Sequence, residues 1–121
     1  MATITPPWTE SVSLRTAATL AAGGTATHDI DLDNLGADRV EVQIDITIGS
    51  SSGVTVEVLS SPDSGTTVDT TALMAYTVAA SDRRTLSLSG AYRQIKLTND
   101  DGSNATGNIA IIYAWRNWSS A

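Results

Sequence analysis

The sequence predicts an all-β protein: a single-domain antiparallel β-sandwich, jelly-roll-like, with about eight strands and an extended N-terminal arm. Three observations predict this class. Apolar residues occupy alternate positions in most segments, turn-forming residues cluster between those segments, and no long segment has helical periodicity. With 121 residues and no cysteine, the chain is long enough to bury a core without disulfide bonds.

The clearest alternation lies between Arg39 and Val58. Apolar residues there hold every second position in two runs: Val40, Val42, Ile44, Ile46 and Ile48, then Val54, Val56 and Val58. A period of two places them on one buried face and leaves the intervening polar residues in water. We interpret the two runs as a β-hairpin closed by the glycine- and serine-rich residues 49–53.

The remaining strands follow at short intervals, separated by Gly, Asn, Asp and Ser. We expect strands at about 11–20, 25–33, 38–48, 53–60, 72–79, 84–89, 92–98 and 107–116. The longest interior loop is expected to cross between the sheets, and it covers residues 60–71. Residues 1–10 contain two prolines and an isolated tryptophan, so they predict an extended arm, and residues 11–121 form the sandwich domain.

The last expected strand is apolar on both faces: Ile109, Ile111, Tyr113 and Trp115 on one, Ala110, Ile112 and Ala114 on the other. A strand in a two-layer sandwich normally exposes one face to water. The second face is therefore covered by the N-terminal arm, by long side chains of neighbouring strands, or by another subunit. Tryptophan is enriched at contact surfaces, so we expect a homo-oligomer. The predicted contact residues are Pro6, Pro7, Trp8, Ile112, Trp115 and Trp118.

Charge and composition exclude several classes of partner. Thirteen acidic and seven basic residues give a net charge of −6, which opposes binding to nucleic acid or anionic lipid. No apolar run approaches the roughly 20 residues that span a bilayer, and the N-terminus has no signal-peptide pattern. We expect neither a nucleic-acid partner nor a membrane partner.

Candidate catalytic residues are few. His28 is the one histidine, and period two places it on the same face as Ile30 and Leu32, which favours a structural role. No acid, base and nucleophile can be named together. We therefore expect no enzymatic activity and no cofactor.

One acidic loop resembles a calcium loop in composition. It runs from Asn99 to Asn104 and offers oxygen ligands from Asp100, Asp101 and Asn104. It lacks the twelve-residue spacing and the final glutamate of an EF-hand, and a turn of this composition needs no metal. We expect no metal site, and calcium bound by these three residues is the alternative.

Two segments carry a family resemblance. Residues 56–65 run from a strand into a Ser-Ser-Pro-Asp-Ser-Gly loop. In residues 91–99, Tyr92 and Arg93 open a strand and Asn99 begins a hairpin loop. Together with the apolar final strand, the chain from about 24 to 116 resembles small all-β virion proteins of tailed bacteriophages.

This resemblance implies a virion structural protein that is assembled in the host cytoplasm. In that class the commonest role is a capsid decoration (cement) protein, which binds the major capsid protein, is often a trimer and overlaps its neighbours with extended arms. Two alternatives stay open. One is a tail, neck or baseplate component, and the other is a carbohydrate-binding module in which Trp118 or Tyr76 contacts the sugar.

Overall fold

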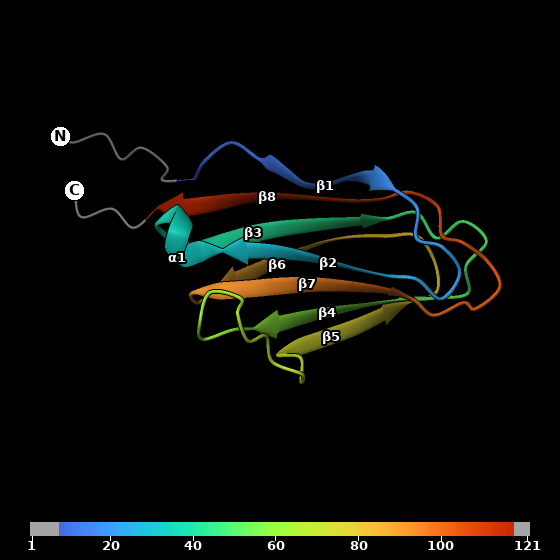
Figure 1. Cartoon of the computed structure of the whole chain (residues 1–121). Coiled ribbons are helices and arrows are strands. Elements are labelled where there is room, and N and C mark those ends of the chain that lie inside the picture. Colours follow the sequence, from blue (N-terminus) through green and yellow to red (C-terminus); the bar gives the residue numbers. More distant parts are fainter. Residues whose placement is uncertain (1–7, 118–121) are drawn as a thin grey trace.

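The computed structural model describes residues 8–117, so Pro6, Pro7 and Trp118 lie outside the described residues. Eight strands form two four-stranded antiparallel sheets that stack as a sandwich (Figure 1). The strands are β1 (Val12–Ala18), β2 (Thr25–Asp31), β3 (Ala37–Ile46), β4 (Val54–Ser60), β5 (Met74–Val78), β6 (Asp82–Ser89), β7 (Tyr92–Asn99) and β8 (Ile109–Asn117). The predicted all-β sandwich is confirmed.

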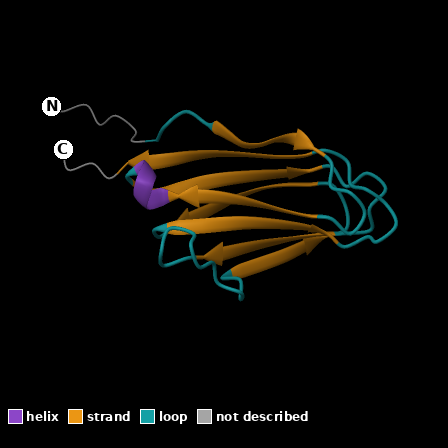
Figure 2. Cartoon of the chain, viewed as in Figure 1, coloured by secondary structure: helices purple, strands orange, loops and turns teal. Residues whose placement is uncertain are grey.

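The strand order is that of a jelly roll. One sheet has the order β1-β8-β3-β6 and the other has β2-β7-β4-β5. Within residues 8–117, β4 and β5 are the one pair of consecutive strands that are hydrogen-bonded neighbours. Every other connection carries the chain from one sheet to the other, and Figure 2 shows these loops gathered at the two ends of the sandwich.

The predicted hairpin between Arg39 and Val58 is therefore wrong. β3 pairs with β6 and β8, whereas β4 pairs with β5 and β7 in the opposite sheet. The expected crossing at residues 60–71 is also wrong, because this loop joins two strands of the same sheet. Likewise, the loop after Asn99 crosses between sheets and closes no hairpin. Alternation specifies which face of a strand is buried, and it does not specify the strand's partner.

The core lies between the two sheets. Val40, Val42 and Ile44 of β3 are fully buried, as are Ile109 and Ile111 of β8. The other sheet contributes Val54, Val56, Val58, Ile95 and Leu97, all at most 1% exposed. Each such side chain contributes about 1.5–3 kcal/mol to folding by leaving water.

A single helical turn, α1 (Leu32–Leu35), replaces the end of the strand expected at 25–33. The carboxylate of Asp31 accepts a hydrogen bond from the backbone N–H of Asn34 at 3.1 Å and so caps the turn. Gly36 ends it in the left-handed conformation, with φ of 68°. Leu32 is completely buried, so the turn closes one end of the core.

Arginine side chains bridge the sheets at both margins of the sandwich. On one margin, Arg15 of β1 contacts His28 of β2, with 3.2 Å between Nη1 and Nε2. On the other, the guanidinium of Arg84 from β6 lies 4.0 Å from the ring centroid of Tyr76 in β5. Both arginines thus cover the ends of the apolar layer.

Candidate functional site on the outer face of β8

β8 lies inside its sheet, between β1 and β3. Its inward face carries Ile109 and Ile111, followed by Tyr113 and Trp115, whose rings stack with centroids 5.7 Å apart. Both aromatic side chains pack against the core cluster. Trp115 thus has contacts inside its own chain, in addition to any contact it makes with another subunit.

The outward face of β8 is only partly covered. Ala110 and Ala114 are half-buried, but Ile112 is 39% exposed. Gln43 of β3 lies directly opposite Ile112, so a long neighbouring side chain supplies part of the shielding. Ile112 remains an apolar side chain available for contact on a solvent-facing sheet.

The first described residues lie against the end of β8. Trp8 forms an antiparallel bridge with Arg116. The next residue is tied to Trp115 twice: the N–H of Thr9 donates to the Trp115 carbonyl at 2.9 Å, and the Trp115 N–H donates to Oγ1 of Thr9 at 3.1 Å. Trp8 therefore docks on its own chain. Its side chain is still 37% exposed.

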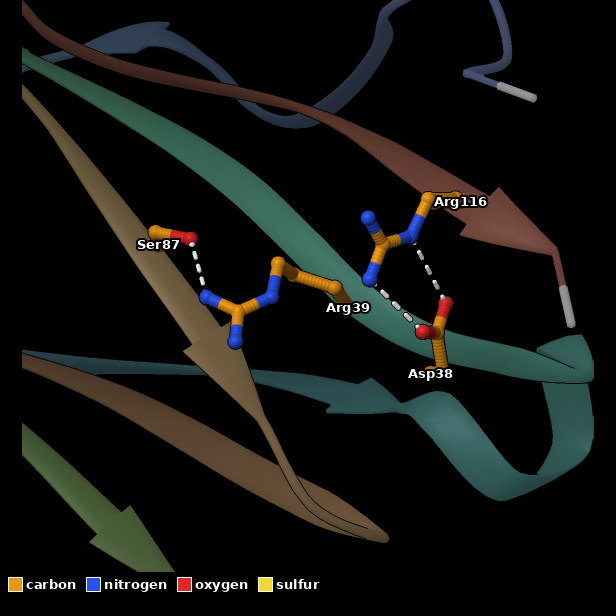
Figure 3. A network of polar contacts seen from close by, with 4 residues as sticks. All are labelled: Asp38, Arg39, Ser87 and Arg116. Carbon is orange, nitrogen blue, oxygen red and sulfur yellow. Dashed lines mark hydrogen bonds and ion pairs between the residues drawn. The ribbon is translucent and has the colours of Figure 1, made fainter. Parts of the chain in front are cut away.

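A charged pair supports the indole of Trp8. The guanidinium of Arg116 lies 5.8 Å from the Trp8 ring centroid, within cation–π range. The same guanidinium donates two hydrogen bonds to Asp38, from Nε at 3.1 Å and from Nη2 at 2.8 Å (Figure 3). These bonds lower the pKa of Asp38 and raise the pKa of Arg116. A fork-to-fork pair of this kind fixes the orientation of the guanidinium.

Local backbone geometry places Asp38 for this role. The register between β3 and β8 shifts between Ala37 and Arg39, so Asp38 is an extra residue in the strand. Such a bulge redirects a side chain. Arg39 then lies opposite Arg116, and its Nη1 donates to the hydroxyl of Ser87 at 2.9 Å (Figure 3). Asp38 bonds to the guanidinium of Arg116, and the positive charge of Arg39 also helps to lower the pKa of Asp38.

We name this surface the β8 face: Trp8, Ile112, Arg116, Asp38 and Arg39. It combines an exposed aromatic ring, an exposed aliphatic side chain and a fixed arginine, which are features of contact surfaces. Sequence reasoning found Trp8 and Ile112 but missed Arg116, Asp38 and Arg39. Nothing in the local sequence marks Asp38 as a bulge, so the pair could only be found in the structure.

The acidic loop uses its oxygens internally. The carboxylate of Asp101 accepts hydrogen bonds from the backbone N–H of Ser103, from the side-chain amide and the backbone N–H of Asn104, and from the backbone N–H of Ser52. These bonds lower the pKa of Asp101 to about 2. Asp100 accepts from the hydroxyl of Thr55 at 2.6 Å. Across residues 8–117, no group of three or more His, Cys, Asp or Glu side chains is arranged to hold a metal ion. The arrangement favours a role for Asp101 in shaping the loop.

The structure places His28 beside Arg15 at the sandwich margin. Burial is the main cause that lowers the pKa of His28, and the charge of Arg15 adds to it, while Asp29 opposes the shift. The described part of the chain contains no helix long and apolar enough to cross a bilayer.

Comparisons with known proteins support the fold. No protein-family model and no curated protein sequence matches the chain. Among solved structures, the PBSX exported protein XepA aligns with a TM-score of 0.67 at 14% identity, over 100% of this chain and 42% of that one. The chain thus spans less than half the length of XepA.

Two further structures match over nearly their whole length. One belongs to the disulfide-linked pili of Bacillus endospore appendages, with a TM-score of 0.56 and 16% identity over 98% of this chain and 96% of that one. The other is the SPBc2 prophage-derived protein YomS, with a TM-score of 0.52 and 12% identity over 95% and 97%. At these identities the likeness establishes the fold alone.

Proposed function

We propose that this chain is a structural protein of a bacteriophage particle and that it decorates the head shell as a cement protein. The observation that carries the proposal is the β8 face, where the exposed Trp8 of the expected N-terminal arm is held on Arg116. The fold shared with the prophage-derived YomS supports the phage setting. The partner proposed is the major capsid protein, and the location is the virion.

The mechanism is burial of a surface that is already ordered. Trp8 is tied down by the hydrogen bonds of Thr9 and by the Arg116–Asp38 pair, so binding costs little further side-chain entropy. Covering the exposed part of its ring and of Ile112 contributes about 25 cal/mol for each Å² of apolar surface removed from water. A shell repeats the contact at every equivalent position, so a modest gain per site stabilises the whole lattice.

The test is rebinding of purified protein to shells that lack it. Trp8→Ala and Ile112→Asp should each reduce occupancy at a fixed protein concentration, and deletion of residues 1–8 should reduce it further. Thr27→Asp is the matched control, because Thr27 is exposed on the outer face of the other sheet. Unchanged occupancy for all three β8-face variants would remove this face from the proposal.

The alternatives use different features. A tail, neck or baseplate component would use the same β8 face in a few copies per particle, so copy number separates it from a decoration protein. The carbohydrate-binding alternative depends on Tyr76 or Trp118. Arg84 already covers one face of the Tyr76 ring at 4.0 Å, and Trp118 lies outside the described residues. The geometry therefore counts against Tyr76 as a sugar contact.

A further inference from the structure

Six of the seven basic side chains have a carboxylate or a backbone carbonyl as a partner or as a cross-strand neighbour. Three arginines form ion pairs with aspartates: Arg83 with Asp45, Arg84 with Asp82, and Arg116 with Asp38. Two arginines donate to backbone carbonyls: Arg15 and Arg93. The lysine lies opposite a carboxylate in the pairing of β4 with β7: Lys96 with Glu57.

Arg39 of β3 has no such partner. It lies opposite Arg116 in β8 and opposite Ser89 in β6. Its hydrogen bond in the described structure runs from Nη1 to the hydroxyl of Ser87 at 2.9 Å. Like charges directly opposite each other destabilise a sheet. The chain thus holds two guanidinium groups side by side against their mutual repulsion.

The carboxylates beside Arg39 in β3 do not pair with it. Both oxygens of Asp38 accept hydrogen bonds from Arg116, so Asp38 is bonded to one of the two guanidinium groups. Glu41 is the next outward-facing residue of β3, and within residues 8–117 it forms no ion pair with Arg39. The donors of Arg39 that Ser87 does not use therefore remain available to a ligand.

These charges adjoin the exposed apolar side chains of the β8 face. Figure 3 shows both guanidinium groups on one side of β3, with that of Arg39 directed toward β6. The guanidinium of Arg116 lies 5.8 Å from the centroid of the Trp8 ring, and Ile112 faces outward on the same strand as Arg116. A segment that docks here meets positive charge and apolar surface together.

We propose that Arg39 binds a carboxylate on an acidic segment of the partner protein, and that an apolar side chain of the same segment covers Trp8. This inference rests on the proposed function, because it takes the β8 face as the contact surface. A carboxylate accepts parallel N–H bonds from a guanidinium, and the neighbouring charge of Arg116 strengthens the attraction. Binding also relieves the repulsion between the two arginines.

Charge favours a short acidic segment over other anionic partners. A nucleic acid carries a charge at every phosphate and needs a long positive surface, whereas this chain has a net charge of −6. At physiological salt, charges more than about 8 Å apart are largely screened, so a short segment responds to the two arginines more than to the net charge of the chain. The same charges repel an acidic segment elsewhere on the surface and so fix its orientation.

The test is titration of the isolated full chain with the terminally blocked peptide Gly-Glu-Leu-Glu-Gly. Heteronuclear NMR spectra follow the side-chain N–H signal of Arg39 and the indole N–H signal of Trp8, and we expect both to shift with one dissociation constant. Followed at Trp8, Arg39→Gln should raise this constant at least about tenfold, because the charge-assisted hydrogen bonds are lost. Arg39→Lys keeps the charge without the planar fork and should lie between the two.

Arg83→Gln is the matched control and should leave the dissociation constant unchanged, because Arg83 is an exposed arginine of the same sheet that already pairs with Asp45. The uncharged peptide Gly-Gln-Leu-Gln-Gly should bind at least about tenfold more weakly than the acidic one. Inorganic phosphate at the same concentration should not displace the acidic peptide. Far-ultraviolet circular dichroism should show the same β-rich spectrum for every variant.

Equal binding of the two peptides, or equal binding by Arg39→Gln and Arg83→Gln, overturns the proposal. Displacement by phosphate also overturns it, because the site would then take any small anion. A sedimentation mass above that of one chain, reduced to one chain by Arg39→Gln, assigns the site to a second copy instead. None of these measurements involves the head shell, so an absence of peptide binding leaves the shell-rebinding result for Trp8→Ala to decide the proposed function separately.

Discussion

Arg15 and His28 join the two sheets at one margin of the sandwich, with Nη1 of the arginine 3.2 Å from Nε2 of the histidine. Arg15 also donates to the carbonyls of Ile109, Ala18 and Thr19, so its guanidinium is held by the backbone of its own sheet. In this contact Nε2 of His28 must accept, which requires a neutral imidazole with its proton on Nδ1. Protonation of His28 removes the acceptor and places two positive charges side by side.

The contact predicts a pH dependence of stability. The pKa of His28 is lowered in the folded chain, whereas the unfolded chain protonates near the ordinary value of about 6.5. As pH falls below that value, the unfolded state binds the proton first, so the free energy of unfolding decreases until folded His28 also protonates. The urea midpoint should therefore fall between pH 7.5 and pH 5.5. Glutamine at this position does not titrate, so His28→Gln should remove the change.

A midpoint that is flat over this range in the native chain would contradict the role of His28. The pKa values of Asp38, Asp63 and Asp101 are also lowered, and these groups affect stability in a more acidic pH range. Their contribution is present above the ordinary aspartate pKa of about 3.9 and is lost only as pH falls below it. The two effects are therefore separated on the pH axis.

Asn99 connects three loops at one end of the sandwich and is 1% exposed. Its Nδ2 donates to the carbonyls of Ala21 and Asn104, and its Oδ1 accepts from the hydroxyl of Ser51 and the N–H of Asp101. Asn99→Ala would remove four hydrogen bonds from buried and part-buried groups, so we expect a loss of about 2–4 kcal/mol in the free energy of unfolding. Urea denaturation measures it. Asn104→Ala, at an exposed position of the same loop, should cost less than about 1 kcal/mol. Equal losses for Asn99→Ala and Asn104→Ala would argue against the role of Asn99 in connecting the three loops.

Substitution of two glycines by alanine distinguishes the cost of backbone strain from the cost of a steric clash. Gly23 and Gly49 both have positive φ, at 65° and 60°. A Cβ on Gly23 would meet nothing within 4 Å, whereas one on Gly49 would lie 2.5 Å from the backbone nitrogen of Gly107. Gly23→Ala should therefore cost about 1–2 kcal/mol, the left-handed penalty alone. Thermal unfolding should show a clearly larger loss of stability for Gly49→Ala. Similar losses for the two variants would mean that the loops carrying Gly49 and Gly107 move apart freely to accommodate the Cβ.

Asp38 should contribute more to binding of the head shell than to the stability of the fold. Its ion pair with Arg116 is partly exposed, and ion pairs near the surface contribute little to stability. We expect Asp38→Asn to leave the urea midpoint nearly unchanged and to reduce shell occupancy, because Arg116 would no longer be fixed under Trp8. Arg83→Gln is a matched control, since it breaks the exposed pair with Asp45 away from Trp8. If Asp38→Asn and Arg83→Gln have the same occupancy, the proposed support of Trp8 is contradicted.

The strands were predictable because period two is a local property. The run from Val40 to Ile46 needs only a buried and a solvated side to produce its pattern, and β3 follows it residue for residue. Pairing was not predictable in the same way. Val54, Val56 and Val58 fit a hairpin with β3 and a place in the opposite sheet equally well, since both bury the same face.

The site was predictable only in its apolar part. Trp8 and Ile112 stand out because their side chains lack an obvious core position in the sequence pattern. Asp38 and Arg116 are 78 residues apart and come into contact through a bulge. No pattern in the sequence near either residue predicts this contact. The helical turn after Asp31 could have been found, because a capping aspartate precedes it and Gly36 ends it.

The most direct test of the proposed function is the copy number of this chain in purified phage particles, measured by quantitative mass spectrometry against the most abundant shell protein. Decoration of the head predicts a number of copies comparable to that of the shell protein. Only a few copies per particle would move the protein to the tail, neck or baseplate. Its absence from the particles would contradict the virion role altogether.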